Sequence, residues 1–97
     1  FYKNAAVFGR IRGLDAEQLK GIMTAFTQMA SKGRVQAEEL RGQLGDRLPG
    51  AEQMFADALG VNTQQLDALM KNGKLLSKDV LPRVSAQMKK MADEAGG

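Results

Sequence analysis

The sequence predicts an all-α fold, a compact orthogonal bundle of five or six short helices joined by tight Gly/Pro turns. Apolar residues recur at three- and four-residue steps along most of the chain, which is the spacing of amphipathic helices. Residues that favour helix caps, and glycines that favour helix ends, stand where these stripes begin and end. No stretch alternates between apolar and polar residues with the β-branched content typical of strands.

The N-terminal third indicates two helical stretches. Residues 1–13 carry a helical stripe interrupted by glycine, which indicates the end of an upstream helix or a linker. The next stripe predicts a helix over residues 15–31, with Asp15 as its N-cap and Gln18 in the position that completes a capping box. Gly33 stands where this helix should end.

The stretch EELRGQLGDRLPGA, residues 38–51, places three glycines and a proline among good helix formers. Leucines four residues apart predict a short helix over residues 37–44, ended by Gly45. Pro49 suits the first turn of the next helix, where its missing N–H costs nothing. That next helix carries an apolar stripe over residues 51–59 and should end at the following glycine.

Two further glycines of this stretch need a tertiary explanation. Gly42 lies inside the predicted short helix, and a neighbouring helix that crosses closely there would account for it. Gly50 is expected to permit close packing at the corner between the two helices.

Two more helices complete the prediction. Thr63 is expected to cap a short helix that ends at Asn72–Gly73. Ser77 is expected to cap the last helix, which runs toward the C-terminus. Pro82 falls within or just after its first turn, where it can tighten or kink the helix.

Length and composition exclude several functions. The 97 residues fit one domain, carry a net charge of +3 and contain no Cys, His or Trp. Without Cys or His the usual nucleophile–base pairs and zinc sites are unavailable, so neither catalysis nor a metal or other cofactor is expected. No apolar run approaches the roughly 18 residues of a membrane helix, so a membrane partner is not indicated. Residue 1 is Phe rather than Met, and we expect a piece of a longer protein whose ordered part ends near Gly96–Gly97.

Charge and methionine content leave two questions open. Residues 1–48 carry eight Lys/Arg against five Asp/Glu, whereas residues 49–97 carry six of each, a milder imbalance than nucleic-acid binders usually show. The six methionines lie on or beside apolar stripes, where they suit the core. A Met-rich docking groove is the alternative, and it requires exposure of several of Met54, Met70, Met88 and Met91.

The segment ADALGVNTQQLDAL resembles the helix-turn-helix of DNA-binding repressors and suggests an alternative function, a DNA-binding module centred on residues 52–72. Gln64, Gln65 and Asp67 would then face the major groove, where glutamine can read adenine. Lys71 is the one cation of that face, although phosphate contacts dominate affinity for DNA. The positions that match the repressor pattern are Ala56, Gly60, Val61, Leu66 and Leu69.

A second resemblance covers most of the chain. The stretch GRVQAEELRGQLGDRLPGAEQMFADALGVNTQQLDALMKNGKLLSKDVLPRV, with text upstream of it, is similar to the conserved N-terminal domain of phage tail tape measure proteins over roughly residues 14–90. We therefore expect residues 14–95 to form such a helical domain, a fragment of a longer chain. The matching positions are Gly33, Val35, Glu38, Glu39, Leu40, Gln43, Leu44, Gly45, Arg47, Leu48, Pro49, Gly50, Ala51, Gly60, Val61, Leu66, Gly73, Leu81 and Pro82.

The resemblance implies a structural or interaction domain that takes part in tail assembly and tail-length determination. Proteins of this kind are long, mostly helical chains that occupy the tail tube during assembly. The implied partners are other tail proteins (tube, tail chaperone or initiator) and further copies of the chain, without a small-molecule substrate or nucleic acid. The implied locations are the host cytoplasm during assembly and the tail lumen of the virion.

The family motif supplies the candidate interaction residues. Its charged positions either contact a partner or serve local capping and surface pairing within the domain, and Arg41 and Asp46 share these two interpretations. The candidates are Glu38, Glu39, Leu40, Gln43, Arg47, Leu48, Pro49 and Gly50.

Overall fold

The computed structural model describes residues 2–95, and no strand occurs among them. The predicted all-α fold is therefore confirmed. Phe1 and Gly96–Gly97 lie outside the described residues. The helices are α1 (Tyr2–Ile11), α2 (Ala16–Lys32), the π-helix η1 (Glu38–Leu44), α3 (Gly45–Arg47), α4 (Ala51–Leu59), α5 (Thr63–Lys71) and α6 (Ser77–Glu94).

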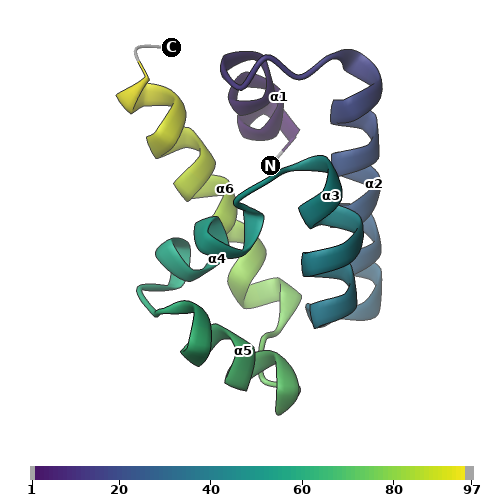
Figure 1. The fold of residues 1–97 in the computed structure, drawn as a ribbon, viewed down its shortest axis with the longest axis vertical. Coiled ribbons are helices and arrows are strands. Elements are labelled where there is room, and N and C mark those ends of the chain that lie inside the picture. The colour runs from purple at the N-terminus through teal and green to yellow at the C-terminus, as the bar shows by residue number, and fades with distance from the viewer. Residues whose placement is uncertain (1, 96–97) are drawn as a thin grey trace.

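Helix α6 passes through the domain and contacts α1, α2 and α4, whereas η1 and α3 lie along α2 (Figure 1). These helices enclose one hydrophobic core. Ala5 and Phe8 of α1 belong to that core, so α1 is packed together with the rest of the chain. The largest fully buried side chains are Phe55, Met29, Leu40, Leu44, Leu66, Met88, Val35, Val80 and Val84.

Both predicted ends of α2 are confirmed. The Gln18 N–H donates to Asp15 Oδ1 at 2.7 Å, and Gln18 Oε1 accepts from the Asp15 N–H at 2.9 Å. This reciprocal pair satisfies two of the N–H groups that a helix leaves free at its start. Gly33 ends the helix with a left-handed φ of 80°, a conformation that costs glycine little.

The predicted caps of the last two helices are wrong by one residue. Asn62 caps α5 through its own capping box with Gln65, and Thr63 is the first residue inside the helix. Leu76 holds the N-cap position of α6. Ser77 instead makes a buried tertiary contact, because its Oγ donates to the Met29 carbonyl at 2.6 Å.

Two linkers that are distant in sequence lie side by side. The Val35 N–H donates to the Leu75 carbonyl at 2.8 Å, and the Ser77 N–H donates to the Gly33 carbonyl at 3.0 Å. An isolated antiparallel bridge joins Arg34 to Leu76. The segment after α2 and the segment before α6 therefore hold each other in place.

The short helix predicted over residues 37–44 forms as η1, with Gly45 as its C-cap, but it is a π-helix. The backbone of Gly45 is right-handed helical, and the turn α3 follows directly to Arg47. A Cβ at residue 45 would lie 3.2 Å from the Leu40 carbonyl oxygen, five residues earlier. Glycine thus suits the wide π turn, in which backbone groups five residues apart approach each other.

The predicted roles of Pro49, Gly50 and Gly42 are also wrong. Pro49 precedes α4 by two residues and does not lie in its first turn. Gly50 caps α4 with a left-handed φ of 87°, and no atom approaches its vacant Cβ position within 4 Å, so it serves backbone conformation and not close packing. No helix crosses closely at Gly42, where a Cβ would also meet open space.

Gly42→Ala is therefore expected to stabilise the domain by about 0.4–1 kcal/mol, because alanine restricts the unfolded chain without a clash in the folded one. Thermal unfolding followed by circular dichroism measures the change. Gly45→Ala is the matched control, and it should give no gain because of the Leu40 carbonyl. A fall in stability for Gly42→Ala would contradict the open environment of this position.

The methionines fill the core. Met54, Met70 and Met88 are buried and Met91 is half-buried. Met29 is fully buried beneath α6. A Met-rich docking groove is therefore not formed, and these flexible side chains serve packing.

Candidate interaction site

The motif residues separate into a buried and an exposed set. Leu40 and Leu48 have 0% and 2% of their surface exposed, and they anchor η1 and the following turn in the core. Gln43, Pro49 and Gly50 are exposed. The leucines of the motif therefore hold the corner in place, and only its polar and turn residues are available to a partner.

Glu39 is a buried member of the motif. Its side chain is 5% exposed, and its Oε2 lies 3.3 Å from Lys32 Nζ of α2. Neither carboxylate oxygen accepts a hydrogen bond from a described residue, so the Lys32 contact is an ion pair without hydrogen-bond geometry. Burial of a carboxylate with so little compensation is costly. Glu39 therefore faces the interior of the domain and does not belong to the exposed surface.

Arg41 joins three helices through two ion pairs. Its Nε lies 2.8 Å from Glu52 Oε2 of α4, and its Nη2 lies 2.6 Å from Asp67 Oδ1 of α5. The hydrogen bond to Glu52, with that to Asp67, raises the pKa of Arg41 above its ordinary value. The guanidinium remains charged at any physiological pH. Arg41 thus pairs within the domain, as one of the two interpretations of these charges expects.

The exposed corner consists of Gln43, Asp46, Arg47, Pro49 and Gly50, all of which are exposed. Arg47 Nη1 donates to the Gln43 carbonyl at 3.3 Å, and Arg47 forms no ion pair with a described residue. Asp46 likewise has no ion pair within residues 2–95. The exposed corner therefore presents one free cation and one free anion to a partner.

Gly21 of α2 supports the exposed corner, and sequence reasoning missed it. A Cβ at this position would overlap Arg47 Nε, so the glycine gives the arginine side chain room to lie across α2. Together with Lys20 and Thr24, these two residues line part of a shallow hollow of about 520 Å3. No local signal in the sequence connects Gly21 to Arg47, because their contact is tertiary.

The corner between α4 and α5 has the packing of a helix-turn-helix but not a free recognition surface. Gly60 adopts a left-handed φ of 71° and turns the chain between the two helices. Gln65 Oε1 accepts from the Asn62 N–H at 3.0 Å, and Asp67 accepts from Arg41. Two of the three side chains expected to face DNA are thus occupied within the domain, and only Gln64 has no such contact.

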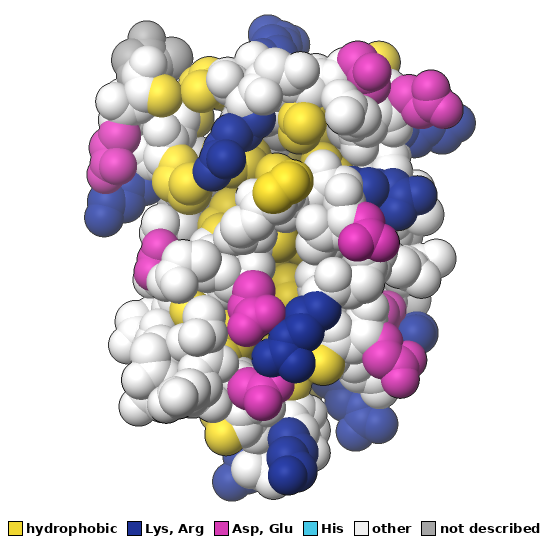
Figure 2. Space-filling model, viewed as in Figure 1, with side chains coloured by type: hydrophobic (Ala, Val, Ile, Leu, Met, Phe, Trp, Pro, Cys, Tyr) yellow, Lys and Arg dark blue, Asp and Glu magenta, His cyan; other side chains and the backbone are white. Residues whose placement is uncertain are grey.

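One face of the domain mixes both signs of charge (Figure 2). On the face shown in Figure 2, basic and acidic side chains alternate around a hollow lined with apolar side chains, and neither sign forms a continuous patch. Within residues 2–95, no cluster of three or more acidic side chains could hold a metal ion. None of the helices in the described part of the chain is long and apolar enough to span a membrane.

These features define an all-helical domain with one core, an internally paired charge cluster and an exposed, partly unpaired corner. A family model described as "Tape measure protein" matches residues 1–97. The chain is 68% identical over its full length to the "Probable tape measure protein" of Salmonella phage Felix O1 (isolate Felix O1-VT1), and it covers 13% of that relative. No solved structure matches the chain. The chain belongs to the tape measure protein family.

Proposed function

We propose that this domain takes part in tail assembly and in tail-length determination as an interaction module of a tape measure protein. Its mechanism is associative and includes no chemical step. The observation that supports this proposal is the division of the family motif, in which leucines anchor the exposed corner while Asp46 and Arg47 remain free of ion pairs within the described residues. Exposed, unpaired charges on a rigid support suit recognition of a partner.

The proposed partners are other tail proteins, namely the tube, a tail chaperone or an initiator, and further copies of the chain. We place the domain in the host cytoplasm during assembly and in the tail lumen of the virion. The chain spans about 13% of the length of its curated relative. A helix-turn-helix DNA-binding function is not favoured, because Gln65 and Asp67 are occupied within the domain.

Charge reversal at the exposed corner tests this proposal. We expect Asp46→Lys with Arg47→Glu, introduced into the parent tape measure protein, to reduce the yield of complete tails while the isolated domain keeps its melting temperature within a few degrees. Exposed residues away from special features usually change stability by no more than about 0.5 kcal/mol. Electron microscopy of lysates gives tail yield and tail length, and circular dichroism gives the melting temperature.

Arg10→Glu is the matched control, since Arg10 is an exposed cation at the end of α1 without an ion pair among the described residues. It should leave tails normal. Normal tails from the corner variant would contradict a partner contact at this site. A loss of tails accompanied by a large fall in melting temperature would assign the corner a structural role instead.

A further inference from the structure

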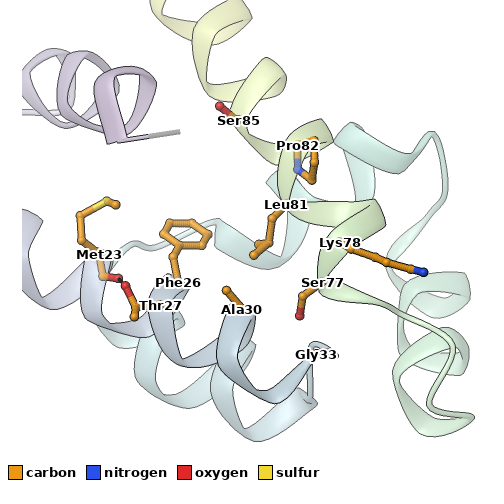
Figure 3. Close-up of a pocket in the computed structure, with 10 residues that line it drawn as sticks. All are labelled: Met23, Phe26, Thr27, Ala30, Gly33, Ser77, Lys78, Leu81, Pro82 and Ser85. Atoms are coloured by element: carbon orange, nitrogen blue, oxygen red, sulfur yellow. Dashed lines mark hydrogen bonds between the residues drawn. The ribbon is translucent and has the colours of Figure 1, made fainter.

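Two hollows flank the first turns of α6, and Lys78 and Pro82 line both of them. The first, of about 880 Å3, lies between α2 and α6, and Figure 3 shows Leu81 pointing across it toward α2. In the same view Lys78 extends away from Ala30 on the α2 side. The second hollow, of about 610 Å3, lies between α6 and the α4–α5 corner. These residues thus form a ridge with an accessible hollow on each side.

The second hollow has an aliphatic floor. Leu59, Val61 and Leu69 are half-buried there, and Leu76 is 37% exposed. Among the large hydrophobic residues of the described chain, only Ile11 and Leu76 reach this degree of exposure. Aliphatic surface left open to water in a hollow is the usual floor of a site that accepts apolar side chains.

The rim of the same hollow is basic. It contains Lys74, Lys78 and Arg83 against the single carboxylate of Asp79, a local charge of +2. None of these four side chains forms an ion pair with a described residue. The lysines near the other end of α6 differ, because each pairs with an acid four residues later in the helix. We call the floor and these three cations the basic groove.

Pro82 adds a polar feature to this rim. Proline has no N–H, so the Lys78 carbonyl lacks the donor that residue i+4 supplies elsewhere in a helix. Both residues are exposed. The rim therefore combines cations with an exposed proline around an apolar floor.

We infer that the basic groove binds an amphipathic helix that carries carboxylates, supplied by another protein of the tail. Apolar side chains spaced three and four residues apart would enter the aliphatic floor, and flanking carboxylates would meet Lys78 and Arg83. A nucleic acid fits less well, because none of the described lining residues is aromatic and Asp79 repels phosphate. The inference rests on the proposed interaction role, which it extends to a second surface and a defined partner chemistry.

Two synthetic helical peptides of equal length test the inference. Both carry leucines at positions i, i+3, i+4 and i+7, one with glutamates and the other with lysines on the flanks. Titration into the 97-residue chain, followed by amide chemical shifts, should show the glutamate peptide perturbing residues 59–61 and 74–83. We expect it to bind about tenfold tighter than the lysine peptide and to weaken as salt is raised.

Lys78→Glu with Arg83→Glu should weaken the glutamate peptide about tenfold. Lys89→Glu with Lys90→Glu is the control, because it makes the same change of charge on the same helix outside the basic groove, and it should leave binding unchanged. Equal affinity of the two peptides, no binding at about 1 mM peptide, or shifts confined to another surface would overturn the inference. Duplex DNA or anionic vesicles could also displace the peptide from this groove. If their binding depended more strongly on Lys78 and Arg83 than the binding of the peptide does, the inference would be overturned.

The groove and the proposed function can fail separately. If the glutamate peptide does not bind but the Asp46→Lys, Arg47→Glu variant fails to give complete tails, the inference about the basic groove is wrong and the proposed interaction role stands. If the peptide binds as expected but neither the corner variant nor the groove variant affects tails, the groove is a real site and the role in assembly is wrong.

Discussion

Phe55→Ala is expected to destabilise the domain by about 3–5 kcal/mol, the usual cost of truncating a fully buried phenylalanine. Phe55 has no exposed surface, and its ring stacks on Phe26 of α2 with ring centroids 6.2 Å apart and an interplanar angle of 2°. The substitution removes that contact and leaves a cavity between α2 and α4. Since the whole stability of a small domain is about 5–15 kcal/mol, the melting temperature should fall by at least about 12 °C.

Two variants make this result specific. Phe55→Leu keeps most of the volume and should cost clearly less than alanine. Ile11→Ala truncates a large hydrophobic side chain that is 38% exposed, and it should shift stability by no more than about 0.5 kcal/mol. Thermal unfolding of the three variants side by side is sufficient. A loss below about 1 kcal/mol for Phe55→Ala would mean that the core is not packed as described.

Glu39→Met is expected to raise the stability of the domain by about 1 kcal/mol, and Lys32→Ala is expected to lower it by about 1–2 kcal/mol. The carboxylate of Glu39 is buried without a hydrogen bond from a described residue, so a methionine of similar volume removes a desolvation cost. Removal of Lys32 instead leaves that buried carboxylate without its ion pair. The loss is below that of fully buried pairs because the Lys32 side chain is 55% exposed.

A double-mutant cycle completes this prediction. Once Glu39 is methionine, Lys32→Ala should cost almost nothing, because the two changes act through one contact. Glu38→Met changes the exposed neighbour in the sequence and should have little effect. The free energies of unfolding come from urea denaturation. A marked loss for Glu39→Met would show that the carboxylate stabilises the domain.

The features of the fold that could be predicted are those set by residues close together in the sequence. The capping box of Asp15 and Gln18 and the stop at Gly33 lie within a few residues of the helix ends that they define. The π-helix was not predicted, because leucines four residues apart fit an α-helix equally well and do not reveal the wider turn. Ser77 has the composition of a cap, but its hydroxyl is used by a carbonyl of α2.

In the candidate interaction site, the burial of the leucines could be predicted from the sequence, but the contacts of the charged residues could not. The spacing of Leu40 and Leu48 indicates burial, and the structure agrees. Charge does not report burial, so the sequence gives no sign that Glu39 is interior or that Arg41 bridges α4 and α5. The net charge of the sequence does not reveal the basic groove, because residues 49–97 are neutral as a whole.

The contact between α1 and α6 has a consequence for the synthesis of this chain. The Asn4 side-chain amide donates to Ser85 Oγ at 2.9 Å, so the first and last helices close the same core across 81 positions of sequence. On the ribosome, α1, α2 and α4 emerge well before α6, so the parts of their apolar faces that α6 covers have no partner until then. Contacts at such long separation also form late in folding. The nascent chain therefore carries an open hydrophobic surface for as long as translation takes to release α6, and during that interval it depends on its surroundings to remain soluble.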